Sequence, residues 1–410
     1  MTPLLNDENE INDNEILLDT LSKVDNEETI TNGEELEVVD NEKDENNEKT
    51  EQPVVYIFKT PVWVWMVLVF ALFTMSSAGS VLMMINVPPL LKASWRLQST
   101  SLFLFFGLFY DLNSFYQYIT VMKIKKLYYS VMGPYQKQLD EKEQEKMVEN
   151  EKKKLQEISE IWNKLFQRNT IALIVATGLI LGLHFAFWVT SLNETTLPHS
   201  LLFVTSSPLM VIVVMLVLRK PITKMEIIGA LVGFLGLLIT LLGSFISTTG
   251  SGSQRPTVYG DLLALLGAAC IVFYLFVGQK LRQWLPLFMY AFPVTFIGSI
   301  LLTVLSLIFE TAPEAIRSYS IVGWFQRDYI LKVLYLGIFP GLFGHTGVNG
   351  IIKYIEPVII SVTLLLEPPI GSLIGYILGV SDGIDIFTLI GGPIIIGGCI
   401  LVTISNSKKK

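Results

Sequence analysis

The chain has 410 residues, of which 51% are hydrophobic and only 16% are charged, and its mean hydropathy is +0.51. A water-soluble protein of this length needs more charge to cover its surface, so an ordinary soluble enzyme or binding domain is excluded. The formal net charge of −7 is unevenly spread, because residues 1–52 hold eighteen acidic residues against three lysines. The remainder of the chain is therefore net basic.

The first 55 residues differ from the rest in composition. They are rich in acidic residues and asparagine and contain no aromatic residue, so they cannot bury enough apolar surface to offset the entropy of ordering. We expect residues 1–55 to form a disordered cytosolic tail. Within it, Asp13, Leu17 and Leu18 have the spacing of an acidic dileucine sorting motif. A chance match is the favoured interpretation for so short a pattern.

Ten apolar segments follow, each close to the ~20 residues that a helix needs to cross a bilayer. Backbone amides and carbonyls in hydrocarbon must pair within the chain, so these segments are expected to be helices. They are residues 62–85, 89–110, 170–191, 197–218, 225–246, 259–279, 286–308, 331–351, 357–379 and 385–405. The sequence therefore predicts an all-α integral membrane protein with ten transmembrane helices.

Lysine and arginine are concentrated in every second loop. They follow the second, fourth, sixth and eighth segments and end the chain in the basic stretch 406–410, whereas the intervening loops carry few. Because positive residues stay on the cytosolic side, we expect a multi-pass protein with both termini cytosolic. The sequence leaves the choice between plasma membrane and endosomal, vacuolar or Golgi membrane open.

One long charged insert, residues 111–168, separates the second and third segments. We expect a charged helix from about Gln136 to Phe166, with an apolar heptad stripe that is too short to establish a coiled coil. The favoured interpretation is a solvated extension of the third membrane helix. The basic and aromatic stretch 123–129 favours contact with anionic lipid headgroups over nucleic acid, because it lies just beyond a membrane segment.

An internal repeat relates the two halves of the apolar region. The stretch beginning at Gly178 aligns with the stretch beginning at Gly337. Gly182 then meets Gly341, Pro208 meets Pro368 after a slip of one residue, and Gly229 and Gly236 meet Gly391 and Gly398. Five helices per half is an odd number, so the second half must enter the membrane upside down. We predict two inverted five-helix repeats, 56–250 and 256–405, around a site near the midplane.

Two stretches carry a resemblance to a known family. HFAFWVTSLNETTLPHSLLFVTSSPL, residues 184–209, and GHTGVNGIIKYIEPVIISVTLLLEPPIG, residues 344–371, resemble the EamA-type family of the drug/metabolite transporter superfamily. The resemblance covers roughly residues 60–405. It implies a ten-helix fold with a central cavity and cytosolic termini, but no single substrate, because the family carries chemically diverse metabolites. The long insert and the lack of an acid at residues 219–221 depart from the family pattern.

These observations together predict a secondary active carrier or exchanger of a small organic metabolite, working by alternating access. A nucleotide-binding G-x-x-x-x-G-K-[ST] loop is absent from the sequence, which argues against an ATP-driven pump. A transport-inactive scaffold and, less favoured, an intramembrane enzyme are the alternatives. We expect no catalytic residue, metal, cofactor or nucleic acid. A proton as coupling ion, a homodimer, and a cytosolic partner of the tail or insert stay open.

Glu367 is the acidic residue placed nearest the middle of a membrane segment, where an acid costs about 2.5–3.5 kcal/mol. Pro368 and Pro369 follow it and break the helix, as Pro208 does in the first half. Glu367 is interpreted either as a proton or substrate-cation site or as an organiser of this break, and the two roles are compatible.

Polar and aromatic residues on two other segments are candidates for the cavity wall. His345 and Asn349 are four residues apart and are expected to share a helix face, as are His184, Trp188 and Ser191. Trp188 would stack on a planar or hydrocarbon group. For His184 and Ser191 interhelical hydrogen bonding is favoured, and for His345 and Asn349 substrate binding is favoured.

Trp95 and Arg96, on the second segment, complete the set of substrate-binding or coupling candidates. Arg96 would either bind an anionic substrate or extend to the outer interface with its guanidinium in water.

Overall fold

The computed structural model describes residues 56–57, 60–132, 141–195, 197–247, 257–310, 320–379 and 386–407. The strand β1 (Tyr56–Ile57) belongs to a separate unit, Met1–Lys59, and everything described below lies within Thr60–Lys410, which begins with the strand β2 (Thr60–Pro61). The motif at Asp13, Leu17 and Leu18 and the C-terminal lysines lie outside the described residues.

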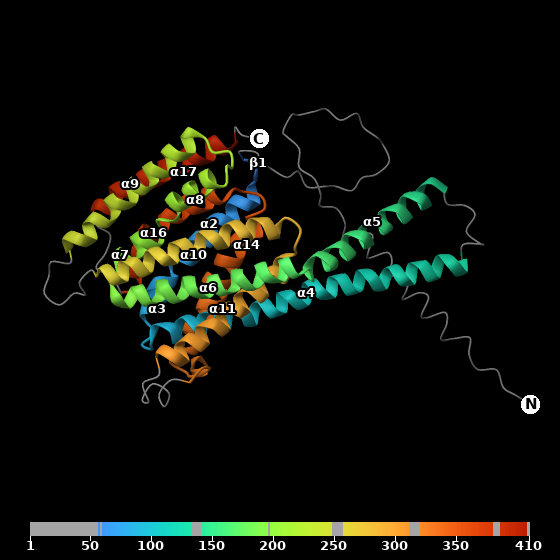
Figure 1. Ribbon diagram of the computed structural model, residues 1–410, viewed down its shortest axis with the longest axis horizontal. Coiled ribbons are helices and arrows are strands. Elements are labelled where there is room, and N and C mark those ends of the chain that lie inside the picture. Colours follow the sequence, from blue (N-terminus) through green and yellow to red (C-terminus); the bar gives the residue numbers. More distant parts are fainter. Residues whose placement is uncertain are drawn as a thin grey trace, which may run out of the picture. The chain divides into compact units, whose positions relative to one another are not determined.

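Helices account for nearly all of the described chain (Figure 1). In chain order they are α2 (Val62–Ser76), α3 (Ala78–Met83), α4 (Pro89–Met132), α5 (Glu141–Leu165), α6 (Arg168–Glu194), α7 (Leu197–Val204), α8 (Ser207–Val217), α9 (Lys224–Ser247), α10 (Val258–Arg282), α11 (Leu287–Phe309), η1 (Gly323–Phe325), α13 (Ile330–Leu336), η2 (Gly337–Thr346), α14 (Gly347–Ile351), α15 (Pro357–Thr363), η3 (Leu364–Leu366), α16 (Glu367–Ile377) and α17 (Ile386–Ser407).

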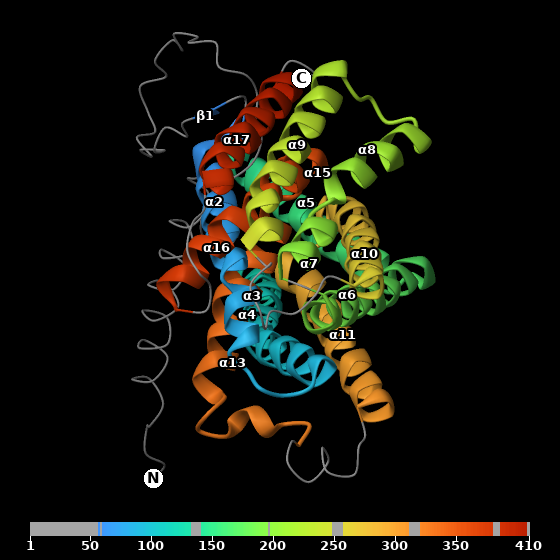
Figure 2. The same ribbon diagram turned by 90° about the vertical axis from the view of Figure 1, so that its left-hand side faces the viewer.

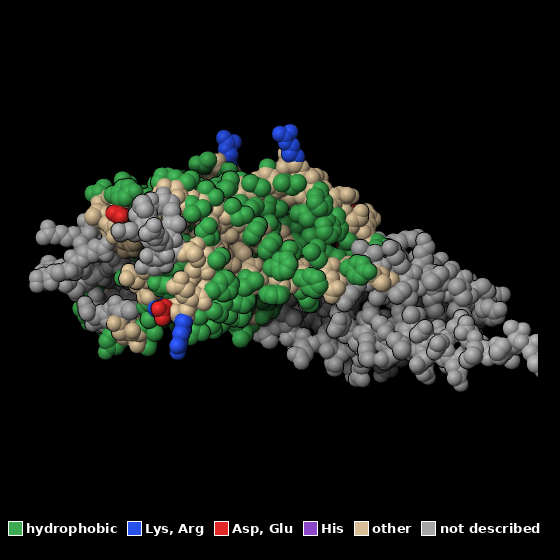
Figure 3. Space-filling model, turned by 90° about the horizontal axis from the view of Figure 1, so that it is seen from below, with side chains coloured by type: hydrophobic (Ala, Val, Ile, Leu, Met, Phe, Trp, Pro, Cys, Tyr) green, Lys and Arg blue, Asp and Glu red, His purple; other side chains and the backbone are tan. Residues whose placement is uncertain are grey.

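Six helical stretches among the described residues are long and apolar enough to cross a membrane. They are Val62–Met83, Arg168–Glu194, Val258–Arg282, Leu287–Phe309, Ile330–Ile351 and Pro357–Ile377. Shorter apolar helices lie at Ser207–Val217 and Leu389–Ser405. Hydrophobic side chains cover most of the described surface seen in Figure 3, and few charged ones interrupt them. Such a surface suits lipid hydrocarbon rather than water.

Two of the predicted spans are broken at the prolines. α7 ends at Val204, and α8 begins at Ser207 with Pro208 in its first turn. In the other span the 3-10 turn η3 follows α15, and α16 begins at Glu367 with Pro368 next in the chain. Proline suits the first turn of a helix because the amide it lacks has no partner there. At each break, polar side chains lie beside backbone amides and carbonyls that are outside the regular pattern of helical hydrogen bonds.

A third span changes its winding. η2 is a π-helical stretch between the α-helical segments α13 and α14, and it contains Pro340 and His345. π-Helical turns are rare and occur mostly at functional sites. The wider turn alters the angle between successive side chains.

The insert differs from the expectation in two ways. The second membrane helix continues unbroken as α4 to Met132, because no glycine or proline intervenes between Gly107 and Gly133. The charged helix α5 is present, but it is not an extension of the third membrane helix. The chain turns at Gln167, whose backbone is extended (φ −64°, ψ 136°), before α6 begins.

Glycines allow α9 and α17 to cross with their backbones in close approach. The two helices lie side by side in both views (Figures 1 and 2). A Cβ on Gly398 would lie 2.5 Å from the carbonyl oxygen of Gly229, and one on Gly236 would lie 2.8 Å from that of Gly391. These two contacts lie on either side of one crossing point. Only residues without a side chain fit there.

α4 and α11 pack against each other, and each carries a carboxylate that caps the start of the other. Glu310, directly after α11, accepts hydrogen bonds from the amides of Leu90 (2.6 Å) and Leu91 (2.9 Å) in the first turn of α4. Asp111 of α4 accepts one from the amide of Phe288 (3.0 Å) in the first turn of α11. First-turn amides lack helical partners and attract negative charge. This reciprocal capping fixes the register of the two helices.

Glu310 leads to a prediction for stability and its pH dependence. Glu310→Ala should lower the free energy of unfolding by about 1–3 kcal/mol, because two part-buried amides lose their acceptor. Glu310→Gln should cost less, since the amide oxygen still accepts. Both are measured by thermal denaturation in detergent. An equal loss in both variants would contradict the capping role.

Burial raises the pKa of the Glu310 carboxyl above its ordinary 4.5, against the opposite effects of Ser306, the two amides and Lys92. The folded protein then binds a proton that the unfolded chain has already released. The stability of the wild type relative to Glu310→Gln should therefore be greatest below pH 4.5. It should fall as pH rises through the raised pKa and stay constant above it. A relative stability that increases with pH would contradict this.

Candidate functional site

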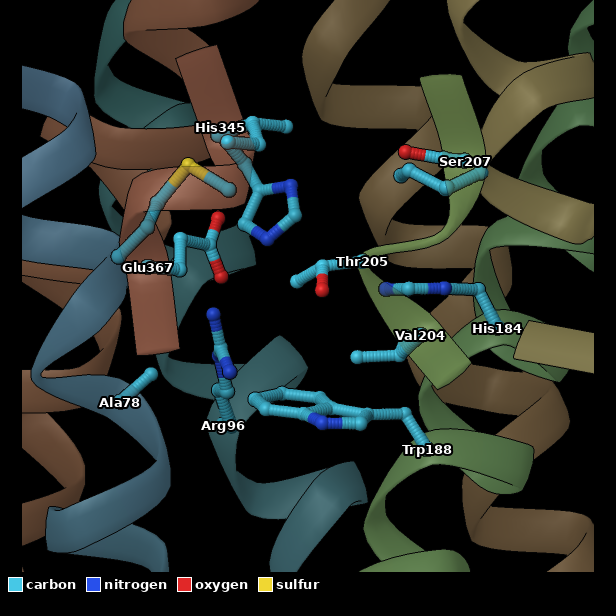
Figure 4. A pocket seen from close by; sticks show the side chains of 12 residues that line it. Ala78, Arg96, His184, Trp188, Val204, Thr205, Ser207, His345 and Glu367 are labelled. Carbon is cyan, nitrogen blue, oxygen red and sulfur yellow. The ribbon is translucent and has the colours of Figure 1, made fainter. Parts of the chain in front are cut away.

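A cavity lies where the broken spans meet the other helices (Figure 4), and the space between its lining atoms, including the part open to solvent, is about 480 Å³. Its wall comes from α2, α3, α4, α6, α7, α8, α10, η2, η3 and α16. The lining residues are Met75, Ala78, Arg96, His184, Trp188, Val204, Thr205, Ser207, Ile271, His345, Leu364 and Glu367.

Arg96 places a charged group in this cavity without the usual partners. Its side chain is only 1% exposed, and its Nε and Nη1 atoms have no hydrogen-bond partner. The guanidinium lies over the rings of Phe185 (4.6 Å to the centroid) and Trp188 (5.5 Å). Aromatic faces stabilise a cation but use none of its N–H donors. Buried donors are normally paired, so these two donors of Arg96 are exceptions and make it a candidate binding residue.

Glu367 lies on the same side of the cavity as Arg96 in Figure 4. Figure 4 shows its carboxylate between His345 and the end of Arg96. The Glu367 and Arg96 charges interact electrostatically, yet among the described residues no ion pair within 4.0 Å joins them. The cavity therefore offers one cationic and one anionic group that face each other without being neutralised by direct contact.

The two histidines contribute differently. His184 Nδ1 lies 2.9 Å from the carbonyl oxygen of Gly267, and its ring is stacked on Trp188 at 6.3 Å between centroids. This hydrogen bond to α10 is the interhelical role that the sequence favoured, although the residue also lines the cavity. His345 contacts the rings of Phe185 (5.3 Å) and His184 (6.5 Å), and its own ring nitrogens make no hydrogen bond to the described residues.

Three candidates from the sequence are not brought to this cavity. Trp95 donates from Nε1 to the carbonyl oxygen of Ile321 (2.9 Å), on a different side of α4 from Arg96. Ser191 is hydrogen-bonded to Ser200 (2.6 Å), so its role is structural. Asn349 donates to the Tyr274 hydroxyl and lies in a separate buried cluster. Asn349 lies one turn beyond His345, in α14, and is not among the residues that line this cavity.

The sequence reading missed Thr205 and Ser207, which line the cavity beside the break between α7 and α8. The signal was available, because Thr205, Ser206 and Ser207 form a polar run directly before Pro208 within an apolar segment. Within the described ranges, no three His, Cys, Asp or Glu side chains are grouped as metal ligands.

Comparisons with known proteins bear on this site. The family model described as "EamA-like transporter family" matches residues 258–404. The uncharacterized transporter YyaM of Bacillus subtilis is 25% identical over 235 residues, which cover 57% of this chain and 72% of that protein. An uncharacterized transporter of Archaeoglobus fulgidus is 24% identical over 200 residues, covering 48% of this chain and 65% of that protein. The second half of the chain is thus similar to the EamA-like transporter family, and both relatives are named as transporters.

These similarities, together with the apolar helices, support an integral membrane protein and, in general terms, a transporter. A solved crystal structure of 15% sequence identity matches with a TM-score of 0.56, covering 85% of this chain and 99% of that one. At this identity the likeness shows the fold alone.

Proposed function

We propose that this protein is a secondary transporter that carries a small organic metabolite by alternating access, with the Arg96 cavity as its binding site. The observation that carries the proposal is the buried guanidinium of Arg96, whose Nε and Nη1 atoms lack a partner within the chain. Burying an unpaired charge costs several kcal/mol, and substrate binding is a reason to retain it. Arg96 belongs to the first half of the chain and Glu367 to the second, so relative motion of the halves would change the cavity.

We further propose that the ten spans form two inverted five-helix repeats. The glycine contacts support this, because the repeat aligns Gly229 with Gly391 and Gly236 with Gly398. A two-fold axis between α9 and α17 would exchange Gly229 with Gly391 and Gly398 with Gly236. The contact of Gly229 with Gly398 is then symmetry-related to the contact of Gly391 with Gly236. Both contacts occur. The reciprocal capping by Asp111 and Glu310 fits the same axis between α4 and α11.

An inverted arrangement would put the insert 111–168 and the C-terminus in the cytosol, on the side favoured by their positive charge. Single cysteines introduced at Glu149 in α5 and at Ser407 test this in sealed, oriented vesicles, with Cys270 and Cys399 replaced by alanine. An impermeant thiol reagent should label both from the same side. Labelling from opposite sides would contradict the proposed orientation.

Transport itself is tested by counterflow in proteoliposomes against a panel of small metabolites. Unlabelled substrate inside should accelerate uptake of labelled substrate, because a carrier returns faster when loaded. Flux that is linear in concentration and shows no counterflow would indicate a channel instead and contradict the proposal.

Glu367 is proposed as the site where a proton couples to transport, since it is the acidic residue that lines the cavity. Glu367→Gln should abolish the pH dependence of flux while the protein still folds, because the amide cannot titrate. The measurement is initial counterflow rate against pH, with wild-type protein as reference. Unchanged pH dependence in the variant would reject the coupling role.

A further inference from the structure

A second cavity lies at the surface of the helix bundle and shares no lining residue with the Arg96 cavity. The space between its lining atoms, including the part open to the surroundings, is about 1060 Å³. Its walls come from α2, α10, α11, η2 and α14, together with residues 353–354 directly after α14. We call this cavity the α2 groove. η2 lies between the two cavities, with His345 lining the first and Phe343 the second.

One part of the α2 groove is apolar and exposed. Phe70 and Phe343 line it with their ring centroids 5.5 Å apart, and they are 49% and 42% exposed. Gly347 and Gly350 of α14 belong to the same wall, and a Cβ on either would meet only side-chain atoms, none closer than 3.5 Å. Exposed aromatic rings beside two residues without side chains leave a channel that suits a hydrocarbon chain.

One end of the α2 groove combines aromatic rings with a lysine. Trp63, in the first turn of α2, packs edge-on against Tyr354 with ring centroids 5.0 Å apart. Lys353 is exposed, and its Nζ lies 4.8 Å from the centroid of the Tyr354 ring. Tryptophan and tyrosine favour the headgroup layer of a bilayer. Trp63 and Phe70 are seven residues apart on α2, which is about 10 Å along a helix, so the groove passes from a polar end to an apolar part.

The positive charges at this end are only partly balanced within the chain. Lys353 forms no ion pair within 4.0 Å to the described residues. Arg282 also lines the groove and donates to the carbonyl oxygens of Asn349 (2.9 Å) and Leu285, which are neutral. Asp111 interacts electrostatically with Arg282 but caps the start of α11. Two cations against one carboxylate leave a net positive charge, which an anionic group from outside the chain would complement.

We propose that the α2 groove binds an anionic phospholipid, with its phosphate group at Lys353 and an acyl chain against Phe70 and Phe343. Arg282 adds its charge from the wall of the groove. In the proposed orientation this end of the groove faces the cytosol, where the membrane surface is rich in anionic lipids that basic residues attract. Lipid binding does not depend on the transport proposal, so each of the two can fail without the other.

The test is a titration of the full-length protein in detergent, followed by native mass spectrometry of the first lipid bound. The probes are phosphatidylglycerol and phosphatidylcholine with the same acyl chains, which differ in net charge, and glycerol 3-phosphate, which has the charge without the chains. Phosphatidylglycerol should bind about fivefold more tightly than phosphatidylcholine, because one lysine at the headgroup contributes a factor of this order. Glycerol 3-phosphate should bind at least about tenfold more weakly than phosphatidylglycerol, since it buries no hydrocarbon.

Substitutions then assign the two parts of the groove. Lys353→Gln should remove the preference for phosphatidylglycerol over phosphatidylcholine. Lys220→Gln is the matched control, because the Lys220 Nζ also lies 4.8 Å from an aromatic centroid, that of Phe276, but Lys220 does not line the groove. It should keep the full preference. Gly350→Leu should weaken the binding of both lipids by filling the groove, and it should leave the melting temperature unchanged because a Cβ fits there.

Four results would overturn the lipid proposal. The first is equal binding of the two lipids to the wild type. The second is a Lys353→Gln variant that keeps the full preference, or a Gly350→Leu variant that binds both lipids as tightly as the wild type. The third is glycerol 3-phosphate that binds as tightly as phosphatidylglycerol, which would indicate a site for a free phosphate ester. The fourth is a protein dimer that Gly350→Leu separates, which would show that a second copy of the chain covers the groove.

Discussion

Replacing Arg96 by glutamine should abolish transport while leaving the protein as stable as the wild type, or more stable. The guanidinium is buried and has two nitrogens without a partner, so its removal relieves a desolvation cost that outweighs the lost contacts with the rings of Phe185 and Trp188. Substrate loses two charge-assisted hydrogen bonds, which corresponds to roughly a 100-fold or greater fall in kcat/KM. Counterflow rate and melting temperature are measured on the same preparation.

Two further variants sharpen this prediction. Arg96→Lys keeps the charge but not the planar array of donors, so it should retain only a fraction of the activity. Lys92→Gln removes a neighbouring buried cation whose Nζ reaches Asn193 at 3.4 Å, outside the cavity, and should transport normally. If Arg96→Gln lost stability and transport together, Arg96 would have a structural role and the binding role would be wrong.

Adding a single methyl group at Gly398 should severely destabilise the protein. A Cβ there would lie 2.5 Å from the carbonyl oxygen of Gly229 and 2.6 Å from the amide nitrogen of Gly233, both of which are backbone atoms. Backbone cannot move aside as a flexible side chain can, so α9 and α17 must separate along their contact. We expect Gly398→Ala to cost at least the ~1–3 kcal/mol typical of overpacking, seen as a large fall in melting temperature.

Gly397 is the matched control, because it is the adjacent residue on the same helix. A Cβ at Gly397 meets no atom within 4 Å. Gly397→Ala should therefore be neutral or stabilise the protein by about 0.5–1 kcal/mol, since alanine favours helix more than glycine does. Similar melting temperatures for the two alanine variants would show that α9 and α17 do not cross as described.

The positions of the helices could be predicted because one physical constraint dominates them. A segment that crosses hydrocarbon must be apolar and helical over about 20 residues, and both properties are readable from the sequence. The breaks near Pro208 and Pro368 were also predictable, because proline removes a backbone donor wherever it occurs. Length and polarity predict a membrane segment that ends at residue 110, whereas α4 continues to Met132, directly before Gly133 and Pro134.

The sequence did not predict equally well which side of each helix faces the cavity. Trp95 and Arg96 are neighbours, and the pattern did not show which of them faces the cavity, since that depends on where α13 and α6 pack. Spacing placed His345 and Asn349 on one face, but it did not show that only His345 lines the cavity, one turn before Asn349. The capping roles of Asp111 and Glu310 depend on partners 177 and 220 residues away and leave no local signal.

In the proposed mechanism, one cavity opens alternately to the two sides of the membrane. Thr205 lines that cavity, so Thr205→Cys in a background without Cys270 and Cys399 reports its accessibility. In oriented proteoliposomes, an impermeant thiol reagent should reach Thr205→Cys from either side. Saturating substrate on one side should decrease the labelling from that side. The total labelling should then be lower than the sum of the labelling measured from each side separately. Labelling from one side only, under every condition, would contradict alternating access.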